Sequence, residues 1–108
     1  MPRWLPSVLT RIRALASAGR VTFTVKVGPE LDALRLRRED AIEILLSLGP
    51  GDYPIRLRST SSDEWLYVFR PAYPGLRLYL KLVIRTDCVV ISCHEDRPEG
   101  REGPAHDQ

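Results

Sequence analysis

The first half of the chain carries apolar residues in patterns that predict helices and one short strand. Their helical spacing predicts a helix over residues 7–18, which Gly19 ends. Alternating β-branched residues predict a strand over residues 21–25. Two more helices are predicted, a short one over residues 30–36 and a longer one over residues 38–48. The N-terminal half is therefore expected to be mainly helical.

The second half has the pattern of four strands joined by short links. Apolar and β-branched residues predict strands over residues 53–60, 65–70, 76–85 and 88–95. Links of so few residues join antiparallel neighbours. Helices followed by such a meander predict an α+β fold, with the N-terminal helices packed on one face of a four-stranded antiparallel sheet. The other face of this sheet is then open to water or to a ligand.

Alternation along the third of these strands separates an apolar face from a cationic face. The apolar set, expected to be core, is Leu76, Leu78, Leu80, Leu82 and Ile84, and the opposite set is Arg77, Tyr79, Lys81, Val83 and Arg85. On the opposite face, alternate side chains are about 7 Å apart along the strand. This strand therefore sets a phenol among several cations on the predicted open face.

The neighbouring strands add to this open face. In the last strand, alternation predicts that Val89, Ile91 and Cys93 face the core, while Ser92 and His94 face outwards. In the first strand, Arg56 and Arg58 lie on one side, with Ile55 and Leu57 on the other. The combined open surface is then expected to hold Arg56, Arg58, Arg77, Tyr79, Lys81 and His94.

These groups suit a phosphodiester substrate. The planar fork of an arginine matches two phosphate oxygens, and fixed cations stabilise the charge of a pentacoordinate transition state. In RNA the neighbouring 2′-hydroxyl can be the nucleophile, so an enzyme needs only an acid, a base and charge stabilisation. His94 is the candidate that titrates near neutrality without help. A cation-rich strand face is also typical of the solvated side of a sheet, so the pattern alone leaves both interpretations open.

A row of aromatic residues allows two interpretations. Trp65, Tyr67 and Phe69 alternate on one side of their predicted strand. Such a row either stacks nucleic-acid bases or fills the core, and we favour packing under a helix or loop.

Length and charge limit the class of protein. With 108 residues, 44% hydrophobic and 28% charged, the chain predicts one globular domain over residues 1–95. No apolar run approaches the roughly 18 residues of a membrane span and no signal peptide is recognised, so we expect a cytoplasmic protein with no membrane partner. The first 94 residues carry 14 basic and 9 acidic side chains. A positive body of this kind favours a phosphate-bearing or acidic partner, whereas residues 96–108 are predicted to be a disordered acidic tail.

The chain has two cysteines, Cys88 and Cys93. Because they lie five residues apart on one predicted strand, we expect their side chains on opposite faces and no disulfide between them. No spacing of cysteine or histidine suggests zinc, so neither a metal nor a cofactor is predicted. This cysteine usage fits a reducing compartment.

Three segments of the second half resemble the MqsR (motility quorum-sensing regulator) family of toxins. They are residues 65–71 (WLYVFRP), 78–81 (LYLK) and 88–94 (CVVISCH), and the resemblance runs roughly from residue 19 to residue 96. It implies a RelE-like α+β fold and a metal-independent endoribonuclease that acts on messenger RNA. It also implies the toxin of a bacterial type II toxin–antitoxin system, neutralised by a cognate antitoxin protein.

The resemblance also assigns roles by position. Tyr79 matches a tyrosine that the family uses at its site, and His94 falls where the family has a basic residue. Ile55 stands where the family often has a functional lysine, with Arg56 one position away. Leu66 stands where some members have a functional glutamine.

Three hypotheses follow. In the leading one, the chain is a ribonuclease toxin in which Tyr79 and His94 share acid–base duty and Arg56 completes the catalytic set. The residues expected to bind RNA are Arg58, Arg70, Arg77 and Lys81. In the alternative, prompted by Ile55 and Leu66, a catalytically impaired relative binds RNA or an antitoxin without cleavage. The third is a structural partner-binding domain whose acidic tail is an interaction arm.

Overall fold

The apolar spacing of the N-terminal half produces three helices within residues 1–97, the part of the chain that the computed structural model describes. They are α1 (Leu5–Ser17), α2 (Val27–Leu34) and α3 (Arg38–Ser47). Helix α1 begins two residues earlier than predicted, because Pro6 suits a first turn that needs no N–H. Gly19, with φ 74°, follows its C-terminus as expected. Helix α3 is capped by the carboxylate of Asp40, which accepts a hydrogen bond from the N–H of Arg37 at 2.8 Å.

The extended patterns produce six strands within the same residues. They are β1 (Val21–Phe23), β2 (Ile55–Arg58), β3 (Trp65–Phe69), β4 (Ala72–Tyr73), β5 (Leu76–Ile84) and β6 (Cys88–Glu95). The two-residue link between β4 and β5 has Pro74 followed by Gly75 at φ 85°. That order suits a tight turn, since proline fixes a negative φ and glycine adopts a positive one.

The sheet has the order β1-β6-β5-β3-β2, and β4 pairs with β5 beside this path. The predicted antiparallel meander of β2, β3, β5 and β6 is confirmed. The prediction of a purely antiparallel four-stranded sheet is wrong, because β1 pairs in parallel with β6, from Val21 opposite Cys88 to Phe23 opposite Val90. The long stretch of helices and strands between β1 and β6 permits this parallel pairing, which a short link would not.

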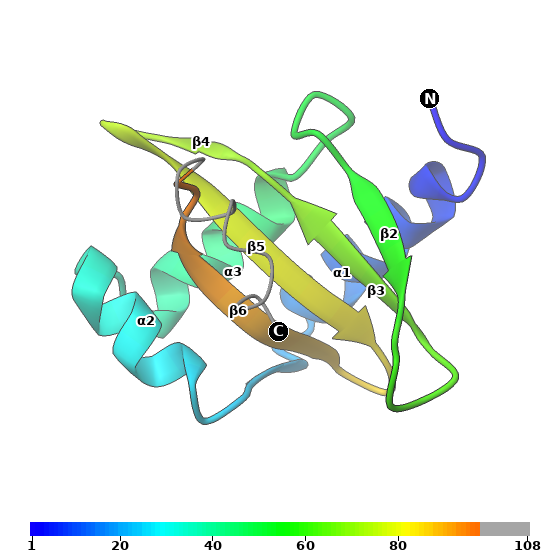
Figure 1. The fold of residues 1–108 in the computed structure, drawn as a ribbon, viewed down its shortest axis with the longest axis horizontal. Coiled ribbons are helices and arrows are strands. Elements are labelled where there is room, and N and C mark those ends of the chain that lie inside the picture. Colours follow the sequence, from blue (N-terminus) through cyan, green and yellow to red (C-terminus); the bar gives the residue numbers. More distant parts are fainter. Residues whose placement is uncertain (98–108) are drawn as a thin grey trace.

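The helices cover one face of the sheet and one end of its β6 edge. Helices α1 and α3 lie behind the sheet in Figure 1, while α2 lies beside β6. Strand β1 covers the edge of β6 only as far as Val90, and α2 follows it in sequence. The core between helices and sheet is one cluster that includes Leu5, Ile12, Val27, Leu45, Phe69, Leu78, Leu80 and Leu82. The α+β prediction with helices on one face is therefore confirmed.

One extra residue in β6 changes which side chains enter this core. Lys81 pairs with Ser92 while Leu82 pairs with Val90, so Ile91 is left without a partner in the β5–β6 ladder. This β-bulge reverses the alternation of faces along β6. Val90 lies in the helix-side core as a result. Val89, predicted to be core, instead pairs with Val83 on the opposite face.

The bulge also corrects the prediction for the two cysteines. Cys88 and Cys93 were expected on opposite faces, but both belong to the helix-side core cluster. Both are free thiols with at most 1% of their surface exposed. Burial raises the pKa of Cys88 to about 12 and that of Cys93 to about 11, with nearby Asp87 and Glu30 adding to the respective shifts.

The helices and the start of the predicted C-terminal tail bear on two further predictions. None of the helices within residues 1–97 is long and apolar enough to cross a membrane. Most of the predicted tail, residues 98–108, lies outside the described residues. Asp96, at its start, still pairs with the sheet, since its N–H donates to the carbonyl of Arg77 at 2.8 Å.

We predict that neither cysteine reacts with a disulfide reagent such as DTNB at pH 8 while the protein is folded. The reacting species is the thiolate, and burial disfavours it at both positions. Both thiols should react fully in denaturant, and the single-cysteine variants Cys88→Ala and Cys93→Ala should behave alike. Rapid reaction of one thiol in the native protein would show that its side chain faces outwards, contrary to the bulged register.

Candidate active site on the open face of the sheet

Tyr79 and His94 face each other across β5 and β6. Residues directly opposite in an antiparallel pair have side chains on the same face, and these two are such a pair. Their rings stack with centroids 5.0 Å apart and an angle of 10° between the planes. His94 is exposed, and its Nδ1 lies 2.9 Å from the carbonyl oxygen of Glu95. The prediction that this phenol and this imidazole share one sheet face is confirmed.

Three cationic residues share the open face with the ring pair. The guanidinium of Arg70, just after β3, lies over the Tyr79 ring with its Cζ 5.4 Å from the centroid. Arg77 donates from Nη1 to the carbonyl of Arg70 at 2.6 Å. Lys81 is half-buried and lies two residues beyond Tyr79 on the same face of β5. The open face therefore brings together five of the seven residues predicted from sequence, Arg70, Arg77, Tyr79, Lys81 and His94.

Arg70 is paired with a carboxylate from the end of the described chain. Its Nε is buried and makes no hydrogen bond with any of the described residues. The same Nε lies 3.4 Å from Oδ2 of Asp96, an ion pair whose geometry does not make a hydrogen bond. The side chain of Asp96 is 8% exposed, so the positive charge of Arg70 is paired with a buried carboxylate.

Arg56 and Arg58 lie on the other face, so the prediction that they share the open face is wrong. Arg56 pairs with Tyr67, and Tyr67 pairs with Leu82, whose side chain lies in the helix-side core. The Cζ of Arg56 lies 3.9 Å from the ring centroid of Trp65. Arg58 also lies over the Trp65 ring, at 4.3 Å, and its Nη1 is 3.3 Å from Asp63.

The physical reason is that β2 is an edge strand with apolar residues on its exposed side. Ile55 and Leu57, expected to face the core, are 41% and 42% exposed. Ile55 pairs with Val68, which pairs with Lys81, so Ile55 is on the open face. Leu57 pairs with Leu66 on that face too. Both positions at which the resemblance implies a polar site residue, Ile55 and Leu66, thus carry apolar side chains on the face of Tyr79 and His94.

The aromatic row packs, as we favoured. Phe69 is fully buried in the core, and Tyr67 packs against the core with its ring 5.4 Å from that of Trp4. Trp65 is half-buried beneath the two β2 arginines. The row therefore belongs to the helix side of the sheet, away from the Tyr79–His94 pair.

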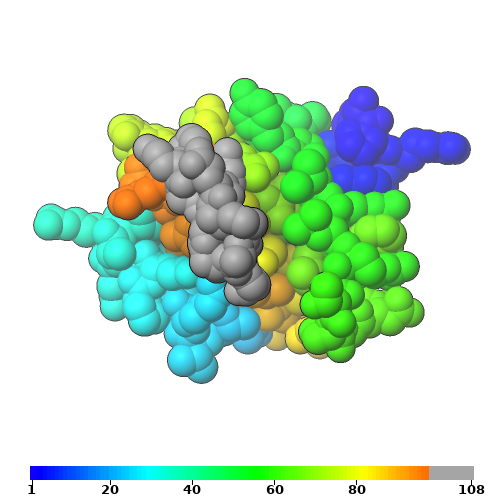
Figure 2. Space-filling model, in the orientation of Figure 1, coloured from blue at the N-terminus to red at the C-terminus, as the bar shows by residue number. Residues whose placement is uncertain are grey.

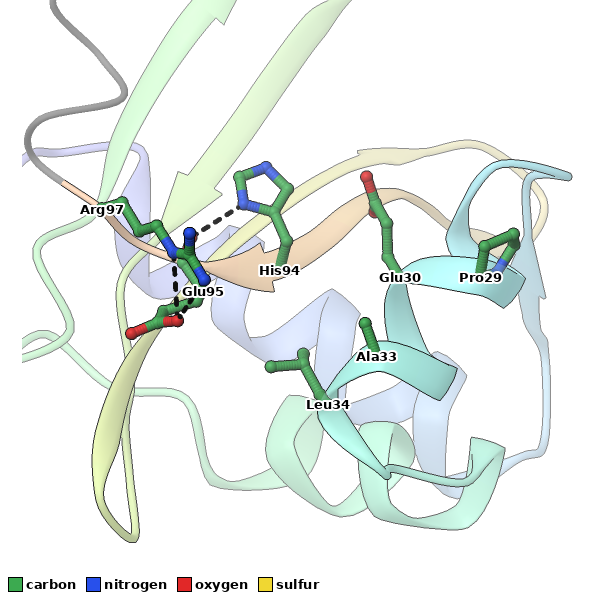
Figure 3. Close-up of a pocket in the computed structure, with 7 residues that line it drawn as sticks. All are labelled: Pro29, Glu30, Ala33, Leu34, His94, Glu95 and Arg97. Atoms are coloured by element: carbon green, nitrogen blue, oxygen red, sulfur yellow. Dashed lines mark hydrogen bonds and ion pairs between the residues drawn. The ribbon is translucent and has the colours of Figure 1, made fainter.

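A groove beside His94 was not predicted from the sequence. It has a volume of about 440 Å³ and lies between α2 and the end of β6, lined by Pro29, Glu30, Ala33, Leu34, His94, Glu95 and Arg97 (Figure 3). Oε1 of Glu30 accepts a hydrogen bond from the N–H of Cys93 at 2.8 Å, and Oε2 is 2.9 Å from Nζ of Lys26. Glu30 therefore ties α2 to the strand residue that precedes His94. No local sequence signal marks this contact, because it depends on where α2 packs.

The His, Cys, Asp and Glu side chains within residues 1–97 form no cluster of three or more that could bind a metal ion. The groups that share the open face are a phenol, an imidazole, two guanidinium groups and an ammonium group, and one guanidinium is paired with the carboxylate of Asp96. This arrangement is suited to bind an anion and to move protons beside it.

We predict that Glu30→Ala lowers the free energy of unfolding by about 1–3 kcal/mol, because it leaves the N–H of Cys93 without an acceptor. Glu30→Gln keeps an acceptor oxygen and should lose less. Urea denaturation of the two variants and the wild type measures the difference. Equal stability of Glu30→Ala and the wild type would contradict the role given to this hydrogen bond.

Comparison with known proteins agrees with the sequence resemblance. No protein-family model matches the chain. The mRNA interferase toxin MqsR of Escherichia coli (strain K12) is 27% identical to it over 89 residues, which cover 81% of this chain and 90% of that protein. The resemblance inferred from residues 19–96 is therefore confirmed at the level of distant homology. The chain is a distant homologue of the mRNA interferase toxin MqsR.

Proposed function

We propose that this chain is an endoribonuclease that cleaves messenger RNA, and that it acts in the bacterial cytoplasm as the toxin of a type II toxin–antitoxin system. The observation that carries the proposal is the stacked pair of Tyr79 and His94 on a sheet face that also holds Arg70 and Lys81. The distant homology to an mRNA interferase toxin supports the same activity. A cognate antitoxin is then the expected protein partner.

The reaction that these groups suit is an internal transfer of a phosphodiester. The ribose 2′-oxygen attacks the adjacent phosphorus, the bond from phosphorus to the 5′-oxygen breaks, and a 2′,3′-cyclic phosphate forms. One member of the Tyr79–His94 pair accepts the proton of the 2′-hydroxyl, and the other gives a proton to the departing 5′-oxygen. Because the nucleophile belongs to the substrate, the protein needs to orient it and to move two protons.

Charge stabilisation falls to the cations around the pair. As the pentacoordinate phosphorus forms, negative charge grows on its non-bridging oxygens. Arg70 lies over the Tyr79 ring, and a phosphate oxygen would compete with the carboxylate of Asp96 for its guanidinium. Lys81 adds a point charge two residues farther along β5.

The alternative is a catalytically impaired relative that binds RNA or an antitoxin. Ile55 and Leu66 favour it, because they place apolar side chains on the site face where polar groups are implied. This alternative requires salt-sensitive RNA binding or tight antitoxin binding without strand cleavage.

We predict that the purified chain cleaves single-stranded RNA in the presence of EDTA and leaves a cyclic phosphate end. Single Tyr79→Phe and His94→Ala substitutions should each lower the cleavage rate by about 10²–10⁴-fold, since each removes one proton-transfer group. The measurement is a single-turnover assay with end-labelled RNA. Intact RNA at high enzyme concentration, or full activity of the Tyr79→Phe/His94→Ala double variant, would contradict the enzyme and leave the binding module.

We also predict that substitution of Arg70 lowers the cleavage rate and substitution of Arg58 does not, because the two residues lie on opposite faces of the sheet. Arg70→Gln should lower the cleavage rate by about 10²–10³-fold, through loss of a charge that stabilises the transition state. The matched control Arg58→Gln should change it by less than about threefold, because Arg58 contacts Trp65 and Asp63 on the helix side. Circular dichroism checks folding of both variants. An equal loss in both would contradict the assignment of the site to the open face.

A further inference from the structure

Tyr53 is an exposed aromatic side chain in an unusual backbone conformation. The residue is 60% exposed. Within residues 1–97, the other exposed large hydrophobic residues are all aliphatic. Its φ of 54° lies in the left-handed region, which a bulky residue rarely occupies. Such conformations persist only where the surroundings hold them, and they cluster at functional sites. Tyr53 lies before β2 and not in it, although the sequence pattern predicts a strand from this residue onwards.

The loop before Tyr53 is fixed to the end of β3. Asp52 and Gly49 exchange two hydrogen bonds, from Asp52 N–H to the Gly49 carbonyl at 3.1 Å and from Gly49 N–H to the Asp52 carboxylate at 2.8 Å. The carbonyl of Asp52 accepts a hydrogen bond from the N–H of Arg70 at 2.7 Å. Pro54 follows, and its ring fixes its own φ at the start of the next segment. Tyr53 is thus held at a fixed place relative to Arg70.

The ring of Tyr53 connects to the proposed site through two arginines. Arg77 lies over the Tyr53 ring, with its Cζ 5.1 Å from the centroid, and donates to the carbonyl of Arg70 at 2.6 Å. Arg70 in turn lies over the Tyr79 ring. Arg77 and Tyr79 are two residues apart on one face of β5, about 7 Å along the strand. Tyr53 therefore flanks the proposed site on the side of β5 away from β6 and the His94 groove.

We propose that Tyr53 and Arg77 form a stacking platform for an RNA base next to the scissile phosphate. This inference rests on the proposed function. Arg77 covers part of the Tyr53 ring, and the exposed remainder of the ring is open to a base. Every base has a π-face, so a single aromatic ring accepts any nucleotide at this position. Arg77 supplies a cation for the backbone phosphate beside that base.

The chemistry of the surroundings favours a nucleotide over an apolar protein segment. The guanidinium of Arg77 lies over the ring, and Tyr53 is not one of the described residues that pack against the core. An apolar partner would have to desolvate this charge, whereas a nucleic-acid strand brings its own phosphates to it.

The test uses an RNA oligonucleotide with 2′-O-methyl groups, which the protein can bind but not cleave by 2′-oxygen attack. 2-Aminopurine replaces one base at a time, and its fluorescence reports stacking. We expect one position to be quenched on binding to the wild type. Tyr53→Ala should abolish that quenching and weaken binding by about ten- to hundredfold, whereas Tyr53→Phe and Tyr53→Trp should retain both. Leu46→Ala, which alters an exposed residue on α3, is the matched control and should change neither.

The outcomes separate this inference from the proposed function. Unchanged binding and quenching in Tyr53→Ala, with cleavage of ordinary RNA by the wild type, would overturn the platform and leave the nuclease standing. Binding without quenching at any position would overturn the platform as well. A wild-type chain that neither binds nor cleaves RNA would overturn both.

Discussion

The bulge at Ile91 is the constraint on which both the core and the site depend. In an uninterrupted β6, Val90 and His94 would share one face, so a buried Val90 would bring the histidine into the core. The extra residue lets Cys88, Val90 and Cys93 fill the helix side while His94 meets Tyr79 on the open side. The N–H of Cys93, beyond the bulge, is then bonded by Glu30 of α2 rather than by another strand. One inserted residue therefore reconciles a closed core with an outward-facing imidazole.

Arginines of the second half form two groups on opposite faces of the sheet. On the helix side, Arg56 and Arg58 cover the ring of Trp65, the half-buried member of the aromatic row. On the open side, Arg70 lies over the ring of Tyr79 and Arg77 lies over the ring of Tyr53. Only the second group lies with the stacked phenol and imidazole, so similar side chains in nearby stretches of sequence take different roles. The apolar Ile55 and Leu66 on the open face stand where the sequence resemblance implies polar residues.

The sequence was sufficient to predict the helices, the antiparallel meander and the Tyr79–His94 pair, because these follow from local periodicity and short links. It predicted strand β1 but not the parallel pairing of this strand with β6, which lies more than sixty residues away along the chain. Alternation of residue types assigned the residues of β2 to two faces. It did not determine which face meets the core, since an edge strand can expose its apolar residues. The bulge was missed because no glycine or proline marks Ile91. The position of Tyr53 beside Arg77 and the hydrogen bond of Glu30 to Cys93 depend on contacts between distant segments, which local patterns do not encode.

The most direct test of this account is to observe which arginine side chains meet RNA. The Nε–Hε signals of the arginines can be followed by NMR while a 2′-O-methyl RNA oligonucleotide is added. The account predicts that the signals of Arg70 and Arg77 shift, together with the ring signals of His94, whereas those of Arg56 and Arg58 stay in place. Shifts confined to Arg56 and Arg58 would place the RNA on the helix side of β2 and contradict the account.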